Sequence, residues 1–133
     1  MAVLSAYMTK KVLDGFFRGE AVSVPSAWYF ALYNTEPGIN NTGTEVSGLG
    51  YARKAMPAMN AAAVQGGKMT VTNAGGLSMD TATGNWTTAN YWAILDAQSG
   101  GNLLVYAPLQ TSITVVNGQT PRFNAGDCVI TLE

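Results

Sequence analysis

The sequence has 133 residues, a length typical of a single domain (1–133) that can bury one core. Charged residues make up only 11% and the net charge is −1, so no basic stripe can neutralise several phosphates, and nucleic acid is not an expected partner. Histidine is absent, which removes the usual general base, the commonest metal ligand and the partner of Ser or Cys nucleophiles, so no catalytic residue, metal or cofactor is predicted.

Apolar residues at spacings of three and four open the chain and predict an amphipathic helix over residues 1–19, ending near Gly19. The residues of this stripe are Val3, Leu4, Tyr7, Met8, Lys11, Val12 and Phe16. Charged residues interrupt the apolar run before a signal peptide or a membrane span could form. We therefore expect a soluble protein made in the cytoplasm, with no membrane partner.

The apolar stripe of this helix has two interpretations. In the favoured one, the stripe covers the open side of a sheet in the same chain. In the other, it is a docking helix that contacts a neighbouring subunit through Leu4, Tyr7, Met8 and Lys11. Both interpretations bury the stripe, and they differ in whether this chain or another one covers it.

The rest of the chain, residues 22–133, consists of short runs rich in β-branched and aromatic residues, separated by turn signals at a spacing of about ten residues. This pattern predicts a mainly β fold, an antiparallel β-sandwich of the jelly-roll-like kind. The predicted strands cover residues 28–33, 51–56, 68–72, 77–79, 90–95, 102–107, 111–116, 119–123 and 128–132. Pro108 is expected to end one strand, and Asn117 with Gly118 predicts a tight type I′ hairpin.

One turn concentrates glycine and charge. Gly48 and Gly50 stand two residues apart, after Glu45 and before Arg53, in a stretch that returns to extended chain. We expect both glycines to adopt positive φ, a conformation that other residues adopt at a cost. Glu45 is predicted to pair with Arg53 or Lys54 across this structural turn.

The same stretch carries a family resemblance. Residues 45–53 read Glu-Val-Ser-Gly-Leu-Gly-Tyr-Ala-Arg, and four further segments follow in order, at 82–86, 94–96, 100–104 and 123–126. Their sequences are Ala-Thr-Gly-Asn-Trp, Ile-Leu-Asp, Gly-Gly-Asn-Leu-Leu and Phe-Asn-Ala-Gly. Together these segments resemble a group of small virion proteins of tailed phages, the tail-fibre-type proteins.

The resemblance implies a non-enzymatic structural component of a tailed phage virion. Such a subunit is a tail-fibre-type, collar or appendage protein that assembles by protein–protein contacts with other virion proteins and with its own copies, in an expected threefold homo-oligomer. It is made in the host cytoplasm and resides in the virion. A capsid decoration (cement) protein on the head surface is the alternative, since small β-sandwich units of this length also serve there.

Sharper hypotheses concern particular side chains. Glu45 and Asp96 lie in glycine-rich turns and could form the carboxylate pair of a glycosidase, whereas in the plainer interpretation Glu45 pairs with a cation and Asp96 bonds the backbone of its own turn. Trp86, beside a loop, is the best candidate for an exposed contact with a partner or a host glycan, the latter making the chain a glycan-binding module. Cys128 is interpreted as a small buried hydrophobe.

Overall fold

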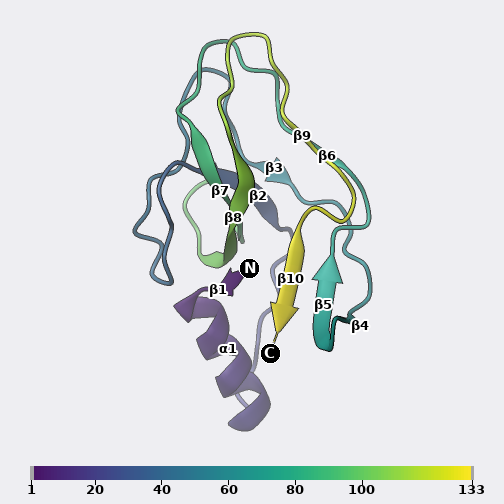
Figure 1. The fold of residues 1–133 in the computed structure, drawn as a ribbon. Helices are drawn as coiled ribbons and strands as arrows, with labels where there is room; N and C mark the ends of the chain where they lie inside the picture. Colours follow the sequence, from purple (N-terminus) through teal and green to yellow (C-terminus); the bar gives the residue numbers. More distant parts are fainter. Residues whose placement is uncertain (1, 133) are drawn as a thin grey trace.

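The computed structural model describes residues 2–132 and is mainly β, with one helix near the N-terminus, as the sequence predicts (Figure 1). The helix is α1 (Ala6–Phe17). The strands are β1 (Val3–Leu4), β2 (Tyr29–Tyr33), β3 (Lys54–Ala55), β4 (Ala63–Gln65), β5 (Lys68–Thr72), β6 (Leu77–Ser78), β7 (Ala89–Leu95), β8 (Leu103–Ile113), β9 (Arg122–Phe123) and β10 (Val129–Leu132). All strand pairs are antiparallel, which agrees with the predicted sandwich.

The largest sheet has five strands in the order β1-β8-β7-β2-β3. Its centre, β2 and β7, is buried on both faces, so β2 reads as a continuous apolar run rather than an alternating one. Phe30 and Leu32 face the main core, while Ala31 and Tyr33 belong to a second apolar cluster on the other face. This double burial explains why both strands are recognisable in the sequence.

Two small sheets complete the fold, one of order β10-β5-β4 and one pairing β6 with β9. They bring Leu77, Cys128 and the partly buried Phe123 to the main core, where the Phe123 ring lies 4.8 Å from that of Phe30. The Phe30 ring also stacks on Trp92, with 6.2 Å between the ring centroids. Aromatic rings therefore join the large sheet to the small ones.

One predicted strand end and one predicted turn type are wrong. Pro108 does not end its strand, because β8 runs on to Ile113 across an irregular pairing in which Tyr91 faces Pro108 and Ala89 faces Ile113. A bulge of this kind tolerates a residue that lacks an N–H donor. The prediction of a type I′ turn at Asn117 and Gly118 is also wrong, because such a turn needs positive φ at both residues. Gly118 has a φ of 90°, but Asn117 does not have a positive φ.

The helix starts later than predicted because Ser5 caps it. The Ser5 hydroxyl accepts a hydrogen bond from the Met8 amide at 3.0 Å and donates one to the Leu103 carbonyl. Leu4, predicted on the docking face of the helix, instead lies in β1 and pairs with Val105 of β8. The sheet therefore begins before residue 22. The predicted end is confirmed, since α1 stops at Phe17 and Gly19 has a φ of 70°.

The helix does not cover a sheet, so the favoured interpretation of its apolar stripe is wrong. None of its residues is buried, and Phe16 and Phe17 are each 82% exposed. Met8, in the first turns, is the helix residue that packs against the main core, and the rest of α1 projects away from the strands (Figure 1). Within residues 2–132, no helix is long and apolar enough to cross a membrane.

Candidate functional site

The predicted charged turn forms a tight corner, which we define as residues 45–53. Arg53 donates to the Glu45 carboxylate through two nitrogens, with distances of 3.0 Å from Nε to Oε2 and 2.9 Å from Nη2 to Oε1. The predicted pairing of Glu45 with Arg53 is thus confirmed. Lys54, the other candidate partner, pairs with Asp80 instead, with 2.8 Å between Nζ and Oδ1. The fork geometry of the Arg53 pair is the strong form of this contact.

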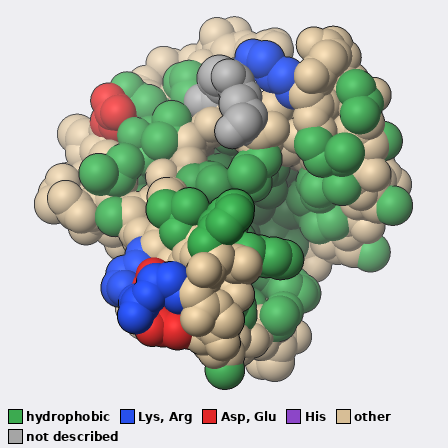
Figure 2. Space-filling view, turned by 90° about the horizontal axis from the view of Figure 1, so that it is seen from below, with side chains coloured by type: hydrophobic (Ala, Val, Ile, Leu, Met, Phe, Trp, Pro, Cys, Tyr) green, Lys and Arg blue, Asp and Glu red, His purple; other side chains and the backbone are tan. Residues whose placement is uncertain are grey.

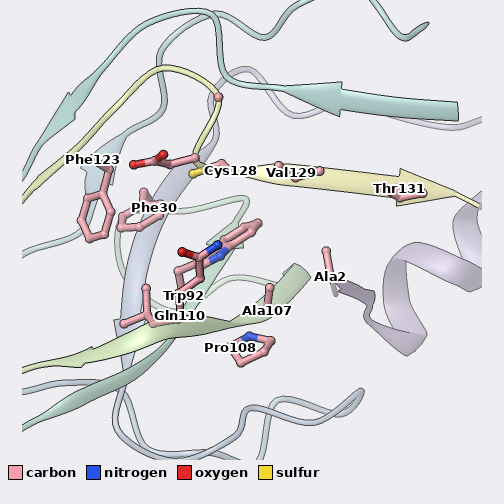
Figure 3. Close-up of a pocket in the computed structure, with 13 residues that line it drawn as sticks. Ala2, Phe30, Trp92, Ala107, Pro108, Gln110, Phe123, Cys128, Val129 and Thr131 are labelled. Atoms are coloured by element: carbon pink, nitrogen blue, oxygen red, sulfur yellow. The ribbon is translucent and has the colours of Figure 1, made fainter. Parts of the chain in front are cut away.

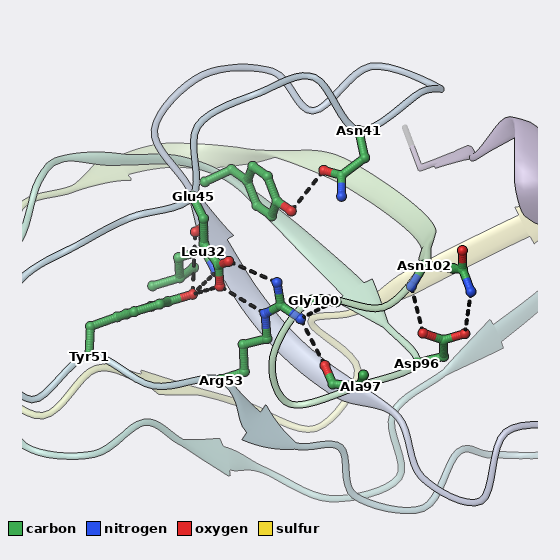
Figure 4. A network of polar contacts seen from close by, with 10 residues as sticks. Leu32, Asn41, Glu45, Tyr51, Arg53, Asp96, Ala97, Gly100 and Asn102 are labelled. Atoms are coloured by element: carbon green, nitrogen blue, oxygen red, sulfur yellow. Dashed lines mark hydrogen bonds and ion pairs between the residues drawn. The ribbon is translucent and has the colours of Figure 1, made fainter.

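The corner is tied to strand β2 and to the loop between β7 and β8 (Figure 4). The Tyr51 hydroxyl donates to Glu45 Oε2 at 2.6 Å and accepts from the amide of Leu32 in β2 at 3.1 Å. Burial, and then the bond to the Glu45 carboxylate, raises the pKa of Tyr51 far above its usual value. Arg53 Nη1 donates to the carbonyls of Ala97 and Gly100, at 2.8 and 2.7 Å. One guanidinium thus fixes the loop between β7 and β8.

Both glycines of the corner adopt positive φ, as predicted. Gly48 has a φ of 153° and Gly50 a φ of 85°. A Cβ on Gly48 would lie 2.5 Å from Cδ1 of Trp86, and one on Gly50 would lie 2.8 Å from the carbonyl oxygen of Thr81. The corner therefore packs its backbone directly against the segment that contains Trp86.

We expect Gly48→Val to destabilise the fold by roughly 4 kcal/mol or more, since it combines a disfavoured φ with a clash against backbone. Gly66→Val is the matched control, because Gly66 has a φ of 59° and nothing within 4 Å of the added Cβ. Gly66→Val should lower the free energy of unfolding by only about 1–2 kcal/mol. Urea denaturation of the two variants measures the difference, and equal losses would contradict the packing account of the corner.

Trp86 is not exposed, so that prediction is wrong. Its side chain is 4% exposed, and its indole nitrogen donates to the Leu49 carbonyl at 2.8 Å. The Tyr51 ring meets it edge-on, with 5.3 Å between centroids. The small Gly48 lets the corner close over the indole ring. The tryptophan that is exposed is Trp28, at 42%.

The two carboxylates of the glycosidase hypothesis hold structural contacts. Glu45 is bound by Arg53 and Tyr51. Asp96 accepts hydrogen bonds from the Asn102 backbone and side chain, at 2.6 and 3.0 Å, as the plainer interpretation predicts. Among residues 2–132, no three His, Cys, Asp or Glu side chains gather into a group that could hold a metal ion.

Cys128 is buried, as predicted, and its backbone N–H donates to Asn73 Oδ1 at 2.9 Å. Burial, and then the neighbouring Asp127 charge, raises the pKa of the Cys128 thiol to about 12. A thiol with so high a pKa stays protonated and weakly nucleophilic near neutral pH.

We expect stability to fall as the pH rises above about 9, because the unfolded Cys128 thiol then loses its proton while the folded one keeps it until about pH 12. The thiol contributes fully to the free energy of unfolding below the pKa that it has in the unfolded chain. Above that pKa, the contribution falls by up to about 1.4 kcal/mol per pH unit. Tyr51, whose pKa is also raised, acts in the same direction at higher pH. Thermal unfolding at pH 8 to 11 measures the slope. Cys128→Ala should flatten it between pH 9 and 10, and parallel slopes would contradict this origin.

The exposed apolar side chains of α1 gather at its C-terminal end. We call Leu13, Phe16 and Phe17 the helix tip; all three are more than half exposed. Of the predicted docking residues on the helix, Tyr7 is 37% exposed and carries Lys11 over its ring at 5.6 Å. The sequence pattern included Phe16, but only the structure shows that nothing in residues 2–132 covers it.

An apolar groove of about 540 Å³ opens next to the base of the helix. Its lining residues are Leu4, Met8, Trp28, Met56, Pro57, Ala58, Met59, Val71, Ile94, Leu104, Val105, Ile130 and Leu132. None of them carries a charge, and Figure 2, which views the molecule from the helix end, shows hydrophobic side chains around a central hollow. Two predicted docking residues, Leu4 and Met8, thus line a groove in place of an exposed stripe.

A second hollow of about 550 Å³ lies between β8 and β10 and is more polar (Figure 3). The rings of Phe30, Trp92 and Phe123 line it together with Gln110 and Asp127. Phe30 and Trp92 are almost fully buried, so their ring faces are occupied by the core rather than presented to solvent.

The comparisons with known proteins give one family. The family described as podophage GP4 fiber I protein gp80 matches residues 3–131, which is nearly the whole chain. None of the curated proteins matches the chain. The match agrees with the resemblance to phage fibre-type structural proteins, and it covers the helix, all three sheets and the corner. The chain therefore belongs to the podophage GP4 fiber I protein gp80 family.

Proposed function

We propose that this chain is a non-enzymatic structural subunit of a phage tail fibre or tail appendage, assembled through contacts with its own copies and with other virion proteins. The observation that carries the proposal is the match of residues 3–131 to a podophage fibre protein family. The fibre description favours the tail over the head surface, where a capsid decoration protein would lie.

The surface of the molecule supports an assembly role. The helix tip and the apolar groove leave large apolar side chains in solvent, and exposed apolar patches of this kind mark sites of protein association. Only 11% of the residues are charged, which suits surfaces that pack against protein. The corner, by contrast, is a rigid internal brace, because its side chains bond to one another and to the sheet.

The glycan-binding alternative is weaker than the assembly role. Its best-placed residue, Trp86, is buried and bonded to Leu49. Trp28 is exposed, but it lies on the rim of a groove whose lining has no charged side chain to hydrogen-bond sugar hydroxyls. Sugar sites combine an aromatic face with convergent polar groups.

The proposal is tested by producing the phage that encodes this chain with the chain's coding sequence interrupted. We expect particles with complete heads whose tails lack an appendage, and restoration of that appendage when the intact chain is supplied in the host. Particles that keep every tail appendage without the chain would contradict the tail role. Loss of a component of the head shell would favour the decoration protein instead.

A further inference from the structure

Within residues 2–132, the helix tip is largely uncovered. Leu13, Phe16 and Phe17 project from a helix of which only the first turns touch the sheet. Lys10 pairs with Asp14, and Arg18 pairs with both Asp14 and Glu20, so these four charges balance one another beside the tip. A balanced, strongly apolar helix end favours an uncharged surface over water.

The apolar groove offers such a surface, but the tip cannot reach the groove of its own copy. The last helix residue that lines the groove is Met8, and Phe16 lies eight residues further on, about 12 Å along the helix axis. In Figure 1 the C-terminal end of α1 lies below the ends of β5 and β10, beyond the strands that line the groove. Among the described residues, the tip therefore does not occupy the groove of its own copy.

We propose that the helix tip of one copy occupies the apolar groove of a second copy. This inference rests on the proposed function and names the partner of the exposed surface. The groove is free of charged residues, as is the tip, so neither surface leaves an unpaired charge in the contact. Met8, Met56 and Met59 in its wall have flexible side chains that adapt to an inserted aromatic ring.

The two surfaces form the apolar centre of the contact. Two phenylalanines that are each 82% exposed offer roughly 300 Å² of apolar area. Each interface pairs the tip of one copy with the groove of the next, so the tip supplies less than half of the roughly 800 Å² per partner of a standard interface, and the polar surface around it forms the rim. The contact is heterologous, with the tip of one copy in the groove of the next, and such contacts close into rings when the rotation permits.

Two variants remove one half of the contact each. Phe16→Lys with Phe17→Lys is the tip variant, and lysines at a helix C-terminus are compatible with the helix. Leu132→Lys is the groove variant, chosen because Leu132 lines the groove and is half exposed. Met59→Gln is a second, milder groove variant. Val64→Lys is the matched control, because Val64 is exposed, apolar and outside the groove.

Light scattering after size-exclusion chromatography measures the mass of each protein, and circular dichroism checks that it is folded. We expect the unaltered chain and Val64→Lys to form an oligomer, and the tip and groove variants alone to be monomers. An equimolar mixture of the tip and groove variants should form dimers with twice the mass of one chain, because it retains one intact tip and one intact groove.

A monomeric unaltered chain at high micromolar concentration would overturn the inference. So would oligomers that survive in the tip variant or in both groove variants, dissociation by Val64→Lys, or a mixture that stays monomeric. None of these results bears on whether the chain is part of the tail, since that is measured on particles.

Discussion

Asn73→Asp is expected to destabilise the fold by roughly 4 kcal/mol or more. The Asn73 side chain is fully buried and makes four hydrogen bonds. Its amide nitrogen donates to the carbonyls of Gly75 and Asn124, and its oxygen accepts from the amides of Gly126 and Cys128. An aspartate of the same size loses both donors and places a carboxylate against two carbonyl oxygens.

The control for this variant is Asn60→Asp. Asn60 is exposed and donates to the Thr72 hydroxyl at 2.9 Å, so the same chemical change should cost less than about 1 kcal/mol there. Urea denaturation measures both variants. If the urea midpoint of Asn73→Asp lay within a few tenths of a molar of the midpoint of the unaltered protein, the Asn73 amide would not be the link between β5 and the turn before β10.

Arg53→Ala is expected to destabilise the fold by about 3–5 kcal/mol, because it leaves the Glu45 carboxylate partly buried without its cation. The variant also removes the Arg53 nitrogen that donates hydrogen bonds to the carbonyls of Ala97 and Gly100. For a chain of this size, a loss of that magnitude corresponds to a fall in Tm on the order of 10–20 °C. Arg53→Lys should recover only part of it, since an ammonium cannot make the forked contact.

Lys54→Ala is the comparison variant, at the position that follows Arg53 in the sequence. The Lys54–Asp80 pair is about half exposed on both sides, and an exposed pair contributes less than about 1 kcal/mol. Differential scanning calorimetry should show a large fall in Tm for Arg53→Ala and a small one for Lys54→Ala. Similar shifts for the two variants would mean that the corner is an ordinary surface contact.

The parts of the molecule that the sequence predicts are those set by neighbouring residues or by strong periodicity. β2 and β7 are recognisable because both of their faces are buried, and the Glu45–Arg53 pair because it spans eight residues of one turn. The positive φ of Gly48 and Gly50 is predictable for the same reason, because both glycines lie within that turn.

The parts that the sequence does not predict depend on contacts between distant segments. Trp86 donates a hydrogen bond to the carbonyl of Leu49, 37 residues away in sequence, and Asn73 accepts one from the amide of Cys128, 55 residues away. β9 pairs with β6 rather than forming a hairpin across Gly118, which no local turn preference reveals. The later start of α1 had a signal that could have been used, since Ser5 is a favoured N-cap residue.

The exposure of the helix tip could not be read from its periodicity. An amphipathic pattern shows that a face will be buried, and it leaves open whether the covering surface lies in the same chain or in another. Here the structure leaves Phe16 and Phe17 uncovered within residues 2–132, and membership of a fibre family places the chain among proteins that assemble with others.

The most direct test of the central claim, a structural role in a phage tail fibre or appendage, is a cryo-EM reconstruction of particles of the phage that encodes this chain. We expect density that fits the three sheets and α1 within a tail fibre or appendage, with the helix tip covered by a neighbouring protein. Density for the chain on the head shell, or intact particles that contain none of it, would contradict the account.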